Sequence, residues 1–217
     1  CQNMSRGKVG QTKYFHAFNL IGCLGPVSFK KLLNYFGSLE KAWEASEEEL
    51  RQAGLEKSIL EAIKEKREKI NPDKEIIRLK NLGINILTLQ DKNYPSLLKE
   101  ISQPPALLYY QGNIKKDELT LAVVGPRKPS FYGQQVVRFL VEKLSLAGLT
   151  IVSGLARGID TLAHQTALKA GGRTLAVIGS GLDQASLYPP SNRKLAQEIV
   201  KQGVLFSEYP PGTPALP

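Results

Sequence analysis

The sequence predicts an α/β protein, with a doubly wound and mainly parallel sheet that follows a small all-α domain. From residue 119 onward, four short apolar segments alternate with three amphipathic segments of helical length. This alternation is typical of a parallel sheet covered by helices on both faces through right-handed crossovers. Upstream, residues 14–70 show only short helical patterns separated by glycine. These patterns indicate a helical domain over residues 1–72 and a Rossmann-like domain over residues 73–217.

The helical domain is expected to hold short helices with clear boundary signals. Ser38 and Ser46 stand where helix N-caps belong, and Gly37 and Gly54 stand where helices end. The expected helices are residues 14–20, 28–35, 39–45, 47–52 and 57–69.

The second domain is expected to begin with a connecting helix over residues 73–81 and a strand over residues 84–89. Pro104 and Pro105 forbid a helix, so residues 106–110 are expected to form another short strand. The regular part is then expected to contain strands 121–124, 150–152, 174–178 and 204–206, and helices 131–146, 159–169 and 192–201, with Ser130 at the N-cap of the first of these helices.

The chain is basic, and its basic residues are least masked in the C-terminal half. Lys and Arg number 29 against 20 Asp and Glu, for a net charge of +9. Residues 119–217 hold ten basic residues against five acidic ones. Such a surplus favours binding to polyanions such as nucleic acid, although a basic protein can also be merely soluble.

The sequence contains no apolar run long enough for a membrane span and no apolar stretch typical of a secretory signal. We therefore expect a cytoplasmic protein. Its two cysteines, Cys1 and Cys23, are too few for a disulfide framework or a four-cysteine zinc site. Neither a metal nor a cofactor is expected.

Three successive strands of the expected sheet each end in a glycine, at Gly125, Gly154 and Gly179. In an open parallel sheet the ligand crevice lies beyond the carboxyl ends of the strands, where backbone amides and helix N-termini can receive an anion. Any one of these glycines can also be required by the turn alone. Their occurrence at three equivalent positions indicates one phosphate-binding rim.

The rim is expected to combine small residues, which let the backbone approach a ligand, with cations that bind phosphate. Arginine can clamp a phosphate through two parallel hydrogen bonds, and lysine contributes a point charge. The candidate nucleic-acid-binding residues are Gly125, Arg127, Lys128, Ser130, Ser153, Gly154, Ala156, Arg157, Gly158, Arg173, Gly179, Ser180 and Gly181. The aromatic candidates for stacking on bases are Phe131, Tyr132 and Tyr188, although core packing is an alternative for each.

Enzyme chemistry has weaker support. The sequence lacks a Gly-x-Ser-x-Gly elbow and a Gly-x-x-x-x-Gly-Lys phosphate loop, and the loop at Gly179 lacks the third glycine of a dinucleotide fingerprint. Asp160 is expected to cap a helix or order its loop, and His164 to be a structural histidine. Glu208 is the best lone candidate for a catalytic carboxylate, but spacing pairs no second carboxylate with it. We expect a binding protein rather than an enzyme.

A weaker signal lies in the helical domain, where Gly22 and Gly25 form a Gly-x-x-Gly hairpin between two expected helices. Such a hairpin can point backbone amides at DNA phosphates. It can equally be the tight turn of a helical pair. Both interpretations stay open.

The order of short motifs after residue 119 resembles the DNA-processing protein A (DprA, also called Smf) family. The segments that carry the resemblance are Val123-Val124-Gly125-x-Arg127-x-x-Ser130-x-x-Gly133, Val152-Ser153-Gly154-Leu155-Ala156-Arg157-Gly158-Ile159-Asp160-x-x-Ala163-His164, Gly171-Gly172-Arg173-Thr174, Gly179-Ser180-Gly181-Leu182-Asp183, Tyr188-Pro189, Asn192 and Ser207-Glu208-Tyr209-Pro210-Pro211-Gly212. The segment from Tyr94-Pro95 through Pro104-Pro105 to Tyr109 also matches.

The resemblance implies a sterile-alpha-motif-like or helix-hairpin-helix-like N-terminal domain and an extended Rossmann domain that binds single-stranded DNA. It also implies a homodimer that helps load the RecA recombinase during natural transformation. The competing function is that of a nucleotide-binding enzyme of the lysine-decarboxylase-like phosphoribohydrolase fold. Those enzymes carry a Pro-Gly-Gly-x-Gly-Thr loop that this sequence lacks.

The sequence departs from the family pattern in three places. Pro126 stands where the family usually has serine, which removes one backbone amide from the loop that begins at Gly125. Four residues separate Asp183 from Tyr188 where two are usual. The family's next motif would begin after Pro217, so we expect this chain to be part of a longer protein whose C-terminal part is missing here.

Overall fold

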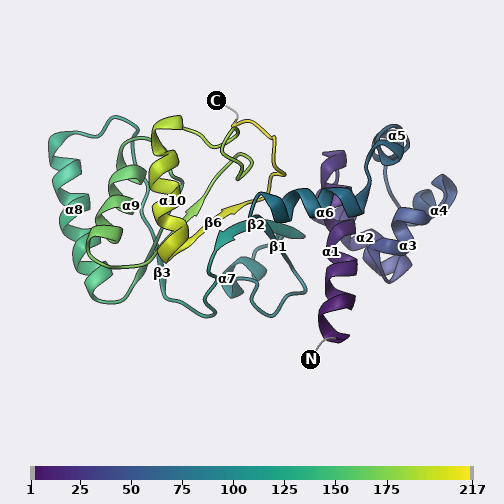
Figure 1. Cartoon of the computed structure of the whole chain (residues 1–217), viewed down its shortest axis with the longest axis horizontal. Coiled ribbons are helices and arrows are strands. Elements are labelled where there is room, and N and C mark those ends of the chain that lie inside the picture. The colour runs from purple at the N-terminus through teal and green to yellow at the C-terminus, as the bar shows by residue number, and fades with distance from the viewer. Residues whose placement is uncertain (1–2, 216–217) are drawn as a thin grey trace. The chain divides into compact units, whose positions relative to one another are not determined.

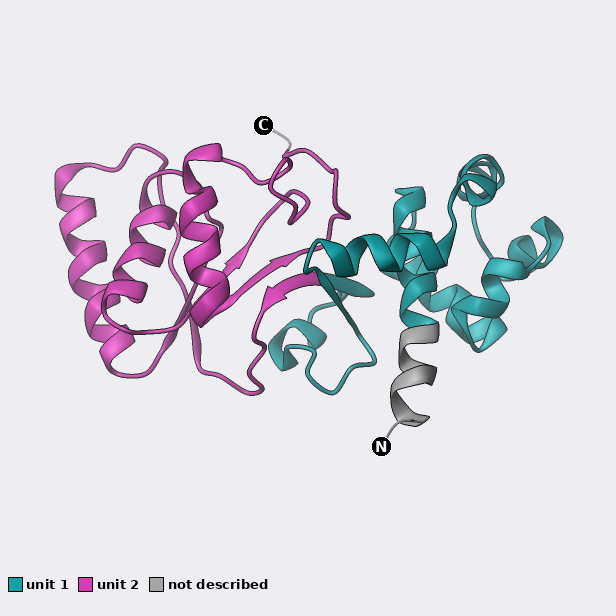
Figure 2. Cartoon of the chain, viewed as in Figure 1, with its two compact units in different colours: residues 1–108 teal, residues 109–217 magenta. Residues whose placement is uncertain are grey.

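The computed structural model describes residues 3–215, with side chains from residue 11 onward. The chain divides into two compact units, residues 1–108 and residues 109–217 (Figure 2). Within the described residues, no helix is both long enough and apolar enough to cross a bilayer.

The first unit opens with a series of helices (Figure 1). Their bounds are α1 Asn3–Ile21, α2 Pro26–Phe36, α3 Leu39–Glu44, α4 Glu47–Gln52, α5 Lys57–Lys66, the 3-10 helix η1 Arg67–Lys69 and α6 Pro72–Asn81. The predicted boundary signals are confirmed. Ser38 accepts a hydrogen bond from the Lys41 amide, Ser46 forms a reciprocal capping box with Glu49, and Gly37 ends α2 with a φ of 74°.

Aromatic packing holds this helical core together. Phe18 makes edge-on contacts with Phe29 and Trp43, with ring centroids 6.4 and 5.0 Å apart, and Phe15 stacks on Phe29. Such arrangements are favourable because the positively polarised edge of one ring lies near the negatively polarised face of its neighbour. The helices therefore share one apolar centre.

Residues 73–108 belong to the first unit, although the sequence pattern assigned them to the second domain. Lys13 on α1 pairs with Asp73 on α6 at 2.8 Å, and α1 and α6 pack together. The unit also contains β1 Asn85–Thr88 and α7 Ser96–Lys99, a short helix that the pattern did not predict. The Tyr94 hydroxyl donates to the Pro105 carbonyl at 2.9 Å and fixes the loop between them.

The strands form one six-stranded sheet in the order β1-β2-β6-β5-β4-β3, which confirms the predicted α/β class with a mainly parallel sheet. The remaining strands are β2 Leu107–Gly112, β3 Thr120–Ala122, β4 Thr150–Ser153, β5 Thr174–Val177 and β6 Val204–Ser207. β3, β4, β5 and β6 pair in parallel in chain order, and β2 runs antiparallel to β6. The carboxyl ends of β3, β4 and β5 therefore share one edge of the sheet.

The parallel strands are connected by α8 Phe131–Leu146, α9 Ile159–Lys169 and, after the 3-10 helix η2 Pro190–Asn192, α10 Arg193–Gln202. α9 packs against both α8 and α10 (Figure 1). Because the crossovers all proceed in one direction across the sheet, right-handed connections place these three helices on one face, where the sequence pattern indicated both faces. Val141 of α8, Ile151 of β4, and Ala163 and Ala167 of α9 form a core where α8 and α9 pack on β4.

Candidate nucleic-acid interface

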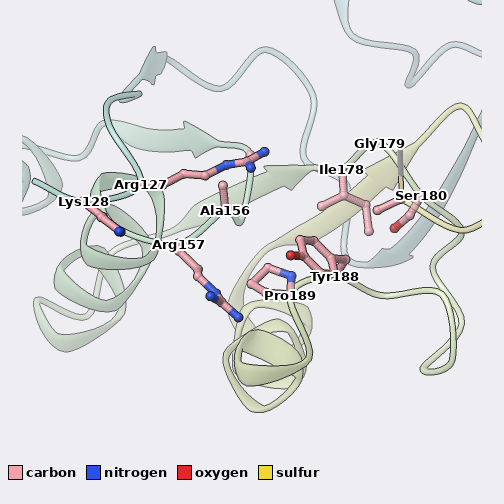
Figure 3. Close-up of a pocket in the computed structure, with 11 residues that line it drawn as sticks. Arg127, Lys128, Ala156, Arg157, Ile178, Gly179, Ser180, Tyr188 and Pro189 are labelled. Atoms are coloured by element: carbon pink, nitrogen blue, oxygen red, sulfur yellow. The ribbon is translucent and has the colours of Figure 1, made fainter. Parts of the chain in front are cut away.

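A pocket of about 290 Å³ lies where the carboxyl ends of β3, β4 and β5 meet (Figure 3). Its lining comes from the first, second and third loops, which follow β3, β4 and β5 at residues 123–130, 154–158 and 178–183, and from two further segments of the second unit. The lining residues are Arg127, Lys128, Gly154, Ala156, Arg157, Ile178, Gly179, Ser180, Tyr188, Pro189 and Ala215. The loops whose glycines indicated a rim in the sequence thus converge on one site.

Seven of the thirteen candidate residues line this pocket. They are Arg127, Lys128, Gly154, Ala156, Arg157, Gly179 and Ser180. Tyr188, named as a stacking candidate, also lines it and is 52% exposed. Sequence reasoning missed Ile178 and Pro189, the neighbours of Gly179 and Tyr188, and also Ala215, which only the three-dimensional path of the chain brings to the pocket.

Three cations give the pocket its electrostatic character. Arg127, Lys128 and Arg157 are all exposed. None of them makes an ion pair or side-chain hydrogen bond with another described residue. Figure 3 shows the Arg127 and Arg157 side chains extending toward the side of the pocket where Tyr188 and Pro189 lie. Cations without a carboxylate partner keep their hydrogen-bond donors available for an anion.

The first two loops are packed tightly against each other by glycines that do not line the pocket. A Cβ on Gly125 would come within 2.6 Å of the Ile159 side chain at the start of α9. Gly158 has a φ of 81°, and a Cβ there would come within 2.7 Å of the Arg127 carbonyl oxygen. The Ile159 amide also donates to the Pro126 carbonyl at 3.3 Å. Gly125 and Gly158 therefore place Arg127 beside the second loop.

The second loop is ordered by Asp160, as predicted. The Asp160 carboxylate accepts hydrogen bonds from the amides of Gly154 and Ala156 at 3.2 and 3.3 Å. These two amides are therefore occupied, which corrects the expectation that they receive a ligand. The Ser153 hydroxyl is also occupied, because it is buried and donates to the Val123 carbonyl at 2.6 Å. What the second loop offers the pocket is the side chain of Arg157.

The third loop is joined to the segment that follows β6. The Gly181 amide donates to the Thr213 carbonyl at 2.9 Å, and Asp183 accepts from the Gly212 amide at 2.8 Å. Burial raises the pKa of Asp183, but hydrogen bonds from Gly212 and Ser186 outweigh it and leave the pKa below its usual value. These bonds bring residues 210–215 to the pocket. The exposed Gly179 amide makes no hydrogen bond with any described residue, so it can serve an anion.

Ser130 and Arg173 lie outside the pocket. The Ser130 hydroxyl caps α8 by accepting from the Gly133 amide at 3.1 Å, so its predicted capping role is confirmed. Arg173 precedes β5 and therefore lies at the opposite edge of the sheet from Gly179, which follows β5. It pairs with Glu118 at 2.6 Å and is 10% exposed. The prediction that Arg173 belongs to the phosphate-binding rim is therefore wrong.

The residues considered for enzyme chemistry are also placed elsewhere. His164 is buried, and its Nδ1 lies 2.7 Å from the Thr174 hydroxyl. Burial lowers its pKa to about 4, so it is neutral and structural at physiological pH. Glu208 is exposed and does not line the pocket. Among the described residues, no cluster of three or more His, Cys, Asp or Glu could hold a metal.

Known proteins resemble this chain in sequence over most of its length. Residues 85–217 match the family model described as DNA recombination-mediator protein A. Protein Smf of Synechocystis is 38% identical over 206 residues, which cover 92% of this chain and 51% of that protein. DNA processing protein DprA of Bacillus subtilis is 41% identical over 133 residues, covering 60% and 44%. The chain thus spans about half the length of the curated relatives it matches.

Solved structures resemble it in fold. The X-ray structure of DprA from Streptococcus pneumoniae matches with a TM-score of 0.74 and 31% identity, covering 94% of this chain and 70% of that chain. DprA from Helicobacter pylori, whose structure concerns its single-stranded-DNA binding mode, matches with a TM-score of 0.53 and 32% identity over 61% and 59%. Since the family model covers more than half of the chain, this chain belongs to the DprA/Smf family of DNA recombination mediators.

Proposed function

We propose that this chain binds single-stranded DNA at the pocket between the first, second and third loops. The observation that carries the proposal is the convergence of Arg127, Lys128 and Arg157 on one pocket, without a carboxylate partner among the described residues. The two guanidinium groups and the ammonium group bind consecutive phosphates of the strand. The Gly179 amide adds a neutral donor at the strand edge.

Tyr188 accounts for the proposed preference of the protein for single-stranded DNA over duplex DNA. Single-strand binding combines a basic groove with aromatic rings on which unpaired bases stack. Tyr188 is half exposed and lines the same pocket as the cations. Phe131 and Tyr132 are exposed at the start of α8 but do not line the pocket. A base next to the bound phosphates therefore stacks on Tyr188, which a paired base in a duplex cannot reach.

Membership of the family supports a proposal for the wider role. We propose that the longer protein is a recombination mediator of natural transformation, acts as a cytoplasmic homodimer and helps load RecA onto the bound strand. The DprA named in the Helicobacter pylori structure binds single-stranded DNA, and related DprA proteins are named for DNA processing. Co-sedimentation of RecA with the full-length protein, with and without single-stranded DNA, tests the RecA contact.

Three ligands at one salt concentration test the proposed DNA binding. Fluorescence anisotropy of a labelled single-stranded oligonucleotide is compared with competition by unlabelled duplex and by a nucleoside monophosphate. The expected order of affinity is single strand, then duplex, then mononucleotide. Tightest binding of the mononucleotide, accompanied by release of free base, would support the phosphoribohydrolase function instead.

A further inference from the structure

Three polar side chains outside the pocket lining hold the second loop in place, and we call them the loop clamp. They are Asp160 and Thr161 in the first turn of α9 and Asn192 at the end of η2. None of the three lines the pocket. Asp160 and Asn192 are both buried, at 7% and 6% exposure, so neither is placed to touch DNA.

The loop clamp satisfies both the donors and the acceptors of the second loop. Asp160 accepts from the amides of Gly154 and Ala156. The Thr161 hydroxyl donates to the Ala156 carbonyl at 2.7 Å. The Asn192 amide nitrogen donates to the Leu155 carbonyl at 2.8 Å, lies 2.8 Å from the Thr161 hydroxyl and reaches the Ala156 carbonyl at 3.4 Å. The residues just before Arg157 are therefore held from two sides.

The held conformation is one that the sequence does not favour by itself. Leu155 has a φ of 59°, in the left-handed region that side chains with a Cβ rarely occupy, and it is fully buried. Such a conformation persists only where its surroundings impose it. The bonds to the carbonyls of Leu155 and Ala156 turn these groups inward, and the chain then leaves Ala156 with Arg157 directed to the pocket.

We propose that the loop clamp, through Asn192, is a positioning device for Arg157 and thereby sets the affinity for phosphate. This proposal rests on the proposed single-strand binding. Asn192 lies 35 residues beyond Arg157 in sequence and belongs to the segment between β5 and β6. It couples that segment to the loop after β4, so that the backbone leading to Arg157 is fixed before the DNA arrives. Preorganisation of this kind spares the cost of ordering the loop on binding.

A double-mutant cycle tests the proposal. Asn192→Ala is made in the wild-type chain and in Arg157→Ala, and anisotropy with an oligothymidylate is measured over a range of salt. In the wild-type background we expect an affinity loss of roughly threefold to tenfold and a salt slope smaller by about 0.7, since one phosphate contact is lost. In the Arg157→Ala background we expect no further change.

Two variants separate positioning from general damage. Thr161→Val removes one hydroxyl while keeping the shape of the side chain, so it is the gentler test if Asn192→Ala does not fold. Thr150→Val removes a buried hydroxyl that bonds Glu118 at the other end of β4, and it should leave affinity unchanged. Circular dichroism establishes the folded fraction of each.

Each outcome decides the question. An equal affinity loss in both backgrounds, or no loss in either, overturns the positioning role of Asn192. If Arg157→Ala itself leaves affinity unchanged, the proposed binding site fails, and the positioning role fails with it. An Arg157→Ala effect without an Asn192→Ala effect rejects the loop clamp alone and leaves the proposed function standing.

Discussion

The two edges of the parallel sheet use arginine in opposite ways. At the carboxyl edge, Arg157 is exposed and has no partner among the described residues. At the amino edge, Arg173 pairs with Glu118 and also donates to the carbonyls of Asn113 and Gln202. Hydrogen-bond partners, rather than charge, therefore distinguish the proposed binding arginine from the structural one. A guanidinium whose donors are used inside the protein has none left for phosphate.

The largest effect is expected on stability, at the amino edge. Arg173→Ala leaves Glu118 mostly buried without its cation, which should lower the free energy of unfolding by about 3 kcal/mol. Affinity for single-stranded DNA, corrected for the folded fraction, should not change. Urea denaturation and anisotropy measure the two quantities. A fall in affinity without a fall in stability would return Arg173 to the binding site.

The next effect concerns the packing of the first two loops. Gly158→Ala should lower the free energy of unfolding by about 2 kcal/mol and weaken DNA binding, because its Cβ meets the first loop. Gly171→Ala is the matched control, since Gly171 has a φ of 70° and nothing within 4 Å of an added Cβ. Gly171→Ala should lower the free energy of unfolding by only about 1 kcal/mol and leave DNA binding unchanged. If both variants lose the same stability and the same DNA affinity, the contact between the two loops contributes to neither.

At the carboxyl edge, Tyr188→Ala should weaken single-strand binding by roughly tenfold, as expected for one lost stacking contact. Tyr188→Phe keeps the ring and should bind like the wild type. Thermal unfolding should differ little between the two variants, because Tyr188 is half exposed. If removal of the hydroxyl weakens binding as much as removal of the ring, a hydrogen bond and not stacking is responsible.

The smallest effect is expected for Lys128→Ala, at about threefold in affinity at fixed salt. Lysine offers a point charge without the two-pronged geometry of arginine. Lys169→Ala is its control, because Lys169 is an exposed lysine at the far end of α9. A loss of the same size in the control would assign the effect of Lys128 to overall charge rather than to the pocket.

Local patterns in the sequence predicted most of the sheet and its loops. The strand ends to within two residues, the Ser130 cap and the role of Asp160 all follow from neighbouring residues. The assignment of Arg173 to the phosphate-binding rim was wrong, and the direction of the strands already excludes it. A residue that precedes β5 lies at the amino edge of the sheet, whereas the rim is formed by residues that follow the strands.

Other features could not be predicted because they depend on distant parts of the chain. Ala215 reaches the pocket through hydrogen bonds from residues 210–213 to the third loop, and no pattern near Ala215 indicates them. Likewise, the placement of residues 73–108 in the first unit depends on packing between α1 and α6. Periodicity identifies α6 as a helix but not the helix it packs against.

The salt dependence of single-strand binding by wild type and Arg127→Ala tests most directly whether the free cations hold phosphates. A plot of log affinity against log salt concentration should give a straight line for each protein. The line for Arg127→Ala should be shallower by about 0.7, so that the two converge at high salt. Coincident lines, or a weaker variant with an unchanged slope, would contradict phosphate binding by Arg127.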